Sequence, residues 1–238
     1  MSDSIVIIPT YNELENIDKM VKMLMELPKE FDVLFVDDNS PDGTSDAIIT
    51  QMELFPNRIF LEKRAGKLGL GTAYIHGFNW SLKRNYEYIF EMDCDFSHAP
   101  SDLIHLYETC KNGSDLSIGS RYVAGGRVKN WPWDRILMSY FASVYVRLIL
   151  WISIKDTTAG FKCYRRKVLE SINFDVIIFK GYAFQICMKY ATHKLGFKIT
   201  EVPITFIDRL FGQSKMSSGI FKEAFFGVWK MRKINFRK

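Results

Sequence analysis

A short apolar run that ends in two acidic residues constrains this chain most. Residues Tyr88–Met92 have the aromatic and aliphatic character of a buried strand, and Asp93 and Asp95 follow two positions apart. In an extended strand residues i and i+2 lie on the same face, so both carboxylates are expected to point into the crevice beyond the strand's carboxyl end. Oxygen ligands of this kind suit Mg²⁺ or Mn²⁺ held jointly with a substrate's phosphates.

The same pair has a simpler interpretation. A turn follows at Ser97–Pro100, and two aspartates at a turn also serve as caps for the next helix. The acidic pair alone therefore does not distinguish a metal site from a solvated turn, and its surroundings decide.

Strands and helices alternate before this point. The expected elements are a strand at Ile5–Ile8 closed by Pro9, a helix at Ile17–Leu27, a strand at Phe31–Val36, a helix at Thr44–Met52 and a strand at Ile59–Leu61. This order predicts an α/β fold with a mostly parallel central sheet and helices on both faces. Ligands bind at the carboxyl ends of such strands, where Asn12, Glu13, Asp37 and Asp38 also fall.

A basic, glycine-rich segment, Lys63–Ala73, precedes another predicted helix. Backbone N–H groups of such a loop and the helix N-terminus can bind phosphate. A glycine turn that merely joins two elements fits the segment equally well.

Composition excludes several classes of protein. The chain has 238 residues, a net charge of +5 and four cysteines without zinc-ligand spacing. The basic residues of the C-terminus lie in one short tail, Lys230–Lys238, beside aromatic residues rather than across a domain, which disfavours nucleic-acid binding. No signal peptide is visible at the N-terminus, so we expect a reduced, cytoplasmic protein.

One apolar stretch, Ile136–Ile154, has nearly the length of a membrane span. A charged Arg147 near its middle costs about 3 kcal/mol on an insertion scale. The stretch is better interpreted as a helix packed on the sheet and partly at a bilayer interface, with Trp131, Trp133 and Trp151 as anchors. For its central part, a wholly buried core helix is the alternative. Further on, Lys198–Phe206 predicts a strand pair at the sheet edge, and Phe221–Ile234 an amphipathic helix.

Eight motifs in register resemble one enzyme family. They are Pro9–Ile17, Val36–Thr44, Lys67–Gly77, Met92–Pro100, Gly119–Tyr122, Trp131–Arg135, Gly160–Lys162 and Arg209–Lys215. Together they resemble the polyprenyl-phosphate hexosyltransferases of the dolichol-phosphate mannose synthase type, which are inverting GT-A glycosyltransferases. The resemblance covers nearly the whole chain.

The resemblance implies one GT-A domain over residues 1–238, with a Rossmann-like sheet and C-terminal amphipathic helices. Residues 1–125 would form the half that binds the nucleotide sugar, and residues 126–238 the half that binds the acceptor, with interfacial helices. The implied reaction moves mannose from GDP-mannose to a polyprenyl or dolichyl monophosphate with Mg²⁺ or Mn²⁺. The chain resembles the peripheral members, so we expect it at the cytoplasmic face of a membrane.

The resemblance also assigns residues. The nucleotide sugar would contact Pro9, Tyr11, Glu13, Val36, Asp38, Asp93, Cys94, Asp95, Arg121, Arg209 and Lys215. The metal would bind Asp93, Asp95 and Ser97, the acceptor phosphate Arg121, Arg135 and Lys215, and the catalytic set would be Asp93, Asp95, Arg121 and Arg135. Cys94 departs from the family, which usually has Ala there. Asp156 is the residue most easily mistaken for a base, since it fits equally well as a cap or as a partner of Lys162 or an arginine.

Other interpretations remain open at this point. A glucosyltransferase that uses UDP-glucose, or an enzyme with a soluble hydroxyl acceptor, would keep the fold and change the substrates. A receiver-like binding module is suggested by Val36–Asp38 after a strand, but the chain length and the acidic pair argue against it. The oligomeric state is not predicted.

Overall fold

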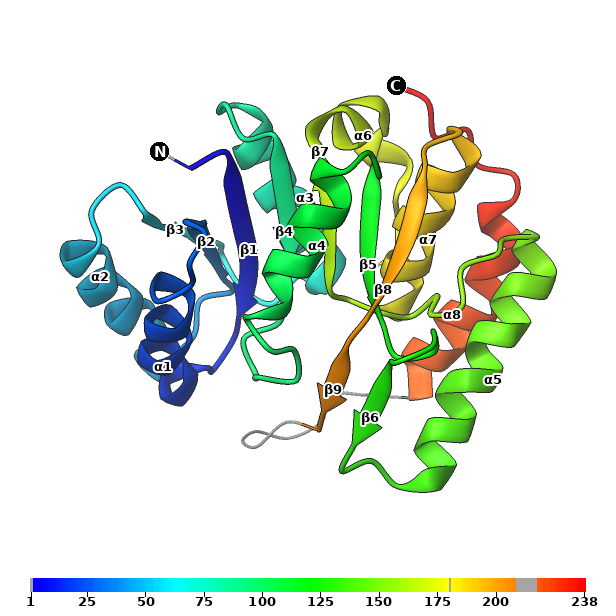
Figure 1. The fold of residues 1–238 in the computed structure, drawn as a ribbon, viewed down its shortest axis with the longest axis horizontal. Helices are drawn as coiled ribbons and strands as arrows, with labels where there is room; N and C mark the ends of the chain where they lie inside the picture. Colours follow the sequence, from blue (N-terminus) through cyan, green and yellow to red (C-terminus); the bar gives the residue numbers. More distant parts are fainter. Residues whose placement is uncertain (1, 180, 209–217) are drawn as a thin grey trace.

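A mixed, mostly parallel sheet forms the centre of the computed structural model, which describes residues 2–179, 181–208 and 218–238 (Figure 1). Among these residues the sheet has seven strands in the order β3-β2-β1-β4-β7-β5-β8. The strands are β1 (Ser4–Thr10), β2 (Asp32–Asp37), β3 (Ile59–Lys63), β4 (Tyr88–Glu91), β5 (Leu116–Ser120), β7 (Lys162–Arg165) and β8 (Ile199–Pro203). The pairs β1–β2, β1–β4, β2–β3 and β5–β8 are parallel, whereas β7 runs antiparallel to both β4 and β5.

Helices cover both faces of this sheet, which confirms the predicted α/β class. They are α1 (Leu14–Met25), α2 (Thr44–Leu54), α3 (Leu70–Leu82), α4 (Asp102–Lys111), α5 (Trp133–Leu150), α6 (Arg166–Ser171), α7 (Tyr182–Lys194) and α8 (Ser218–Met231), with a 3₁₀ turn at Phe174–Val176. Side chains alternate between faces along a strand, so Ile5 and Ile7 belong to a core cluster that also contains side chains of α3, α5, α6, α7 and α8. Val6 and Ile8 belong to a second cluster on the opposite face, with side chains of α1, α2 and α4.

The structure corrects two expectations about strands. Pro9 does not close the first strand but lies within β1, opposite Val36 of β2. It is tolerated there because pairing of β1 with β4 stops at Ile7, so Pro9 has a strand on one side only. Strand β7 was not predicted at all, because Lys162–Arg165 contains two basic residues in four and looks like a loop. Lys162 is nevertheless fully buried, where it forms an ion pair with Glu91 of β4.

The predicted strand pair at Lys198–Phe206 is also wrong in its pairing. β8 is indeed the edge of the main sheet, but β9 (Thr205–Ile207) pairs with β6 (Arg127–Lys129) in a separate two-stranded sheet. In Figure 1 this small sheet lies below the main sheet, on the side of the carboxyl ends of its parallel strands. The loops that carry polar residues therefore meet on that side.

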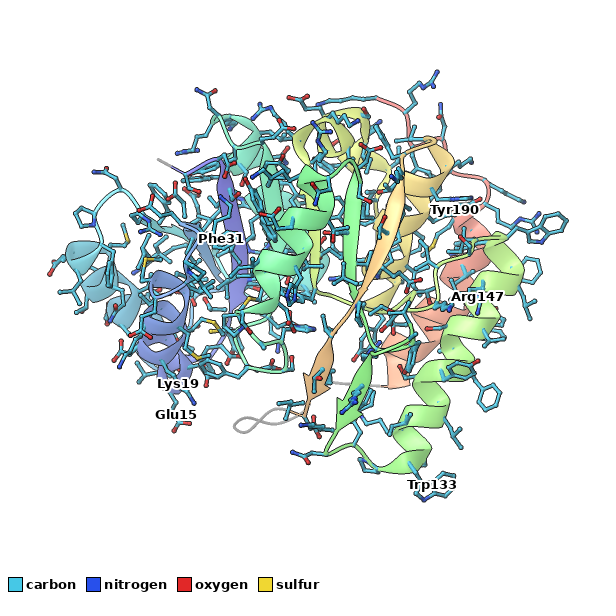
Figure 2. All side chains as sticks on the ribbon, viewed as in Figure 1. Glu15, Lys19, Phe31, Trp133, Arg147 and Tyr190 are labelled. Atoms are coloured by element: carbon cyan, nitrogen blue, oxygen red, sulfur yellow. The ribbon has the colours of Figure 1, made fainter. Side chains whose placement is uncertain are left out.

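Helix α5 is neither wholly buried nor membrane-spanning. Val146 and Leu150 pack in the core, whereas Trp133 has 74% of its surface exposed. Figure 2 shows Trp133 at the lower end of α5, pointing away from the protein body. Within the described ranges no helix is both long and apolar enough to cross a bilayer.

Helices α5 and α8 together present an exposed apolar face. Phe225 of α8 stacks on Tyr145 of α5 with ring centroids 4.7 Å apart, and Trp229 Nε1 donates to Tyr145 Oη at 3.0 Å. The exposed large apolar side chains of this face are Trp133, Leu137, Met138, Tyr140, Phe141, Leu148, Trp151, Phe225, Phe226 and Trp229. We call these residues the α5/α8 face.

Candidate active site

The acidic pair lies just beyond β4 rather than within it. β4 ends at Glu91, and Asp93 and Asp95 are half-buried in the bend that follows, which corrects the expectation of a continuous strand. The backbone N–H of Ser97 donates to Asp95 Oδ1 at 3.1 Å, and Phe96 between them has a left-handed backbone (φ 58°). Cys94, between the two carboxylates, is buried in the core. Asp93 and Asp95 therefore lie just beyond the carboxyl end of β4.

A tyrosine from another element contacts the first carboxylate. Tyr74 of α3 donates from its hydroxyl to Asp93 Oδ1 at 3.2 Å. Nothing in the sequence pattern pointed to this residue, because an aromatic side chain on a predicted amphipathic helix looks like ordinary core.

The glycine-rich loop lies beside the expected nucleotide residues. Lys67 Nζ is 4.7 Å from the centre of the Tyr11 ring, and Arg64 Nε donates to Asp38 Oδ1 at 2.6 Å. Arg64 also donates to Thr72 Oγ1 in the first turn of α3, so it ties β2 to the loop. Burial raises the pKa of Asp38 above its ordinary value, although Arg64 acts in the opposite direction.

The other residues expected to bind the nucleotide lie at the ends of β1 and β2 or just after them. Pro9 and Tyr11 are half-buried, Glu13 accepts from Asn16 Nδ2 at 2.8 Å, and Val36 is fully buried. Asp37, next to Asp38, is structural, since its carboxylate accepts hydrogen bonds from Thr10, Ser40 and Ser45.

Arg121 forms a buried ion pair with Asp156. Its Nε and Nη2 donate to the two carboxylate oxygens at 2.7 and 2.6 Å, and Nη2 also donates to Thr158 Oγ1 at 2.8 Å. Burial alone would raise the pKa of Asp156, but the charge and hydrogen bonds of Arg121 outweigh burial and hold it below its ordinary value. Asp156 is therefore an ionised anchor for Arg121. The backbone N–H of Asp156 donates in turn to Glu201 Oε1 at 2.9 Å.

A tryptophan lies close to both predicted arginines. The guanidinium carbon of Arg135 lies 4.1 Å from the centre of the Trp131 ring, and that of Arg121 lies 5.4 Å from it. Arg135 Nη1 forms an ion pair with Asp208 at 3.2 Å, and both side chains are partly exposed. Two guanidinium groups thus lie near the Trp131 ring at the start of α5, each also paired with a carboxylate.

Two buried polar atoms near this cluster have no hydrogen-bond partner in the described part of the chain: Trp131 Nε1 and His98 Nδ1. His98 stacks on Phe161 at 4.9 Å and contacts Phe206 edge-on, as Trp131 does. Burial lowers the pKa of His98 to about 4, so its ring is neutral at physiological pH.

The structure thus places the predicted residues in two groups. Asp93, Asp95, Tyr11 and Asp38 follow the carboxyl ends of the parallel strands, while Arg121 and Arg135 flank Trp131. Arg209 and Lys215 lie outside the described residues. Sequence reasoning missed Arg64, although the basic glycine-rich loop that contains it was noticed.

The ligand chemistry of the acidic pair limits the metal it can hold. In the described ranges no group of three or more His, Cys, Asp or Glu side chains gathers as a metal site. Two half-buried carboxylates fit a hard divalent ion that takes its other ligands from a bound substrate or water.

Known proteins resemble this chain closely. The model of the family "Glycosyl transferase family 2" matches residues 5–172. A polyprenol monophosphomannose synthase from Mycolicibacterium smegmatis is 46% identical over 96% of this chain and 87% of its own length. An undecaprenyl-phosphate mannosyltransferase from Micrococcus luteus is 46% identical over 94% of this chain and 91% of its own.

Solved structures support the fold. A glucosyl-3-phosphoglycerate synthase from Mycobacterium tuberculosis, crystallised with Mn²⁺, UDP and glucosyl-3-phosphoglycerate, aligns with a TM-score of 0.71 at 16% identity. That alignment covers 98% of this chain and 81% of the synthase. The same synthase with Mn²⁺, UDP and phosphoglyceric acid gives a TM-score of 0.72 at 15% identity, covering 98% and 79%. The GT-A architecture expected from the motifs is confirmed.

The receiver-like interpretation is wrong, because the family model spans all the strands from β1 to β7 and continues through α6. The acidic bend after β4 and the polar ends of β1 and β2 fall inside the same matched range. The chain belongs to glycosyl transferase family 2 and is a glycosyltransferase.

Proposed function

We propose that this enzyme transfers mannose from GDP-mannose to a polyprenyl monophosphate of the dolichyl type. The observation that carries the proposal is the pair of guanidinium groups around Trp131, at the start of the helix that exposes the α5/α8 face. An anionic headgroup on an apolar chain needs both features side by side. The names of the two curated relatives agree with this substrate.

Residues 1–125 form the donor half in this proposal. Pro9, Tyr11, Glu13, Val36 and Asp38 line the nucleotide pocket. Val36 is fully buried, so it contributes through its backbone. Arg64 fixes Asp38 at the pocket.

Asp93 and Asp95 would hold Mg²⁺ or Mn²⁺ between themselves and the donor diphosphate, with Ser97 as a further ligand and Cys94 packed beneath. Such an ion supplies Lewis-acid stabilisation of the departing diphosphate. The backbone N–H of Ser97 and the hydroxyl of Tyr74 orient the two carboxylates. Arg209 and Lys215, outside the described residues, would add positive charge at the phosphates.

Residues 126–238, together with Arg121, form the acceptor half. Arg121, Arg135 and Lys215 would bind the acceptor phosphate, because arginine forks match phosphate oxygens and lysine supplies a point charge. The hydrogen bonds of Arg121 to Asp156 and Thr158 use Nε and Nη2, which leaves Nη1 for the ligand. The buried Trp131 Nε1 is a further donor at this site.

This acceptor needs no protein base. A phosphomonoester has a second pKa of about 6, so its attacking oxygen is already anionic near neutral pH. A sugar hydroxyl would instead have to lose a proton as it attacks, which calls for a carboxylate base. Asp156 is unsuited to that task because Arg121 occupies both of its carboxylate oxygens.

Contact with a bilayer would present the lipid to these arginines. The α5/α8 face supplies apolar surface, and the exposed basic residues Lys155, Lys230, Arg232, Lys233, Arg237 and Lys238 lie near it in sequence. Stable peripheral binding generally requires both an apolar anchor and attraction to anionic lipid. We place the enzyme at the cytoplasmic face of a membrane on this basis.

The test is to incubate the enzyme with polyprenyl monophosphate and either labelled GDP-mannose or labelled UDP-glucose, and then to extract the lipids. Label that becomes organic-soluble only from GDP-mannose supports the proposal. Label that enters the lipid phase only from UDP-glucose would make the enzyme a glucosyltransferase on the same acceptor. Transfer only to a soluble hydroxyl compound would contradict the acceptor assignment.

A further inference from the structure

The ring of Tyr74 is locked in the core, although its hydroxyl reaches the acidic pair. Tyr74 is fully buried in α3. Its ring lies parallel to that of Phe184 (6.1 Å, 4° between planes) and stacks on Phe78 at 6.3 Å. A side chain packed in this way has one orientation, so the hydroxyl is a fixed point beside Asp93.

That hydroxyl is the polar end of an otherwise apolar contact. A phenol O–H has one hydrogen to donate, and in Tyr74 it is directed at Asp93 Oδ1 at 3.2 Å. Asp93 must accept this bond, so the bond restricts the rotation of its carboxylate.

The strand below Asp93 is equally fixed. Glu91, two residues earlier, accepts hydrogen bonds from Tyr164 at 3.0 Å and Gln185 at 2.9 Å, and it forms an ion pair with Lys162 at 3.0 Å. All four side chains are buried. The backbone just before Asp93 is therefore fixed by these contacts. Tyr74 acts on the Asp93 carboxylate itself.

We propose that Tyr74 is a positioning residue that holds the Asp93 carboxylate in the orientation that binds a divalent cation. The inference rests on the proposed metal role of Asp93. Partners of metal-ligating carboxylates typically change metal affinity 10–100-fold when removed. Tyr74 lies one turn into α3, directly after the glycine-rich loop, so the same helix would join that loop to the metal site.

The test compares Tyr74→Phe with a matched variant, Tyr86→Phe. Tyr86 is also fully buried and its hydroxyl also donates to a buried carboxylate, Asp32 Oδ2 at 3.0 Å, but Asp32 begins β2 at the opposite end of the sheet. Binding of Mn²⁺ alone is followed by the loss of the free-ion EPR signal. Thermal unfolding of both variants is measured in parallel.

We expect Mn²⁺ to bind Tyr74→Phe about 10-fold or more weakly than the unsubstituted enzyme. Tyr86→Phe should bind it as the unsubstituted enzyme does, even if both variants unfold at a lower temperature. Equal Mn²⁺ affinity in Tyr74→Phe and the unsubstituted enzyme would overturn the inference and leave Tyr74 a core residue. The inference would also be overturned if Asp93→Ala still bound Mn²⁺, or if the unsubstituted enzyme did not bind Mn²⁺.

The lipid-transfer assay answers a separate question. Absence of sugar transfer together with Tyr74-dependent Mn²⁺ binding would contradict the proposed substrates and support the positioning role. Normal sugar transfer, together with Mn²⁺ binding that is unchanged in Tyr74→Phe, would contradict the positioning role alone.

Discussion

The Arg121 guanidinium donates to both carboxylate oxygens of Asp156, from Nε at 2.7 Å and from Nη2 at 2.6 Å. Both side chains are buried, and the pair joins the end of β5 to the loop before β7. Because both oxygens of Asp156 accept from Arg121, we expect Asp156 to orient the arginine rather than to accept a substrate's proton.

Asp156→Asn should retain measurable sugar transfer while losing stability. Removing one partner of a buried ion pair generally costs about 3–5 kcal/mol, because the other charge stays buried. Initial rates measured from pH 6 to 8 should be lower than those of the wild type at every pH, and the shape of the pH profile should not change. A dead variant together with a wild-type profile governed by a protein carboxylate would mean that a base is used.

The same ion pair predicts how stability depends on acid. Because the pKa of Asp156 is lower in the folded chain than the value of about 3.9 in an unfolded one, the pair stabilises the fold fully above pH 4 or so. This stabilisation is lost as the pH falls through the lowered pKa. Urea unfolding at stepwise lower pH should show a smaller acid-induced loss in Asp156→Asn than in the wild type.

Arg135→Ala should lose most of its sugar transfer without unfolding the protein, since Arg135 and its ion-pair partner Asp208 are both partly exposed and such pairs contribute little to stability. We expect a rate at least 100-fold lower, with the acceptor KM raised, because phosphate loses a guanidinium ligand. Arg165→Ala is the matched control, as Arg165 forms a similar pair with Glu87 at the opposite end of β4. Equal losses in both variants would show a general effect on folding.

Removal of the metal should stop the reaction. Asp95→Ala is expected to lose transfer while keeping its unfolding temperature, since Asp95 is half-buried in a bend outside the sheet. Excess chelator should inactivate the wild type, and added Mg²⁺ or Mn²⁺ should restore it. Full activity of Asp95→Ala, or of the wild type in chelator, would show that the reaction needs no metal at this site.

Membrane attachment should depend on the α5/α8 face. Replacing Trp133 and Phe141 by alanine is expected to reduce sedimentation with anionic liposomes at least severalfold, and added salt should weaken binding of the wild type. Leu54→Ala is the control, since Leu54 is 63% exposed on α2, away from this face. Equal binding to neutral vesicles in high salt would show that electrostatic attraction is not involved.

Much of the fold was readable from local sequence patterns, and the failures have physical causes. Strands β1 to β4 are apolar runs, so periodicity found them. Strand β7 instead carries Lys162 and Arg165, which form ion pairs with Glu91 of β4 and with Glu87 just before it. Such tertiary pairing leaves no signal in a four-residue window. The pairing of β9 with β6 is likewise a long-range contact that no local pattern reports.

The site, like the fold, could be predicted where local sequence motifs report it and not where it depends on long-range contacts. Asp93, Asp95 and Arg121 lie in motifs that resemble a known family, so their positions were expected. The hydrogen bonds from Arg64 to Asp38 and from Tyr74 to Asp93 join residues 26 and 19 positions apart in the chain. They depend on how α3 and the loop before it pack against the ends of β2 and β4, which the sequence pattern does not specify.

The central claim is that the acceptor is a lipid monophosphate, and the most direct measurement compares polyprenyl monophosphate with the corresponding unphosphorylated polyprenol. Labelled GDP-mannose is supplied to both, and organic-soluble label is measured between pH 5 and 8. We predict product only from the phosphate, with a rate that rises through the acceptor's second pKa of about 6 and is then flat. Transfer to the polyprenol, or label found only on a water-soluble hydroxyl compound, would contradict the account.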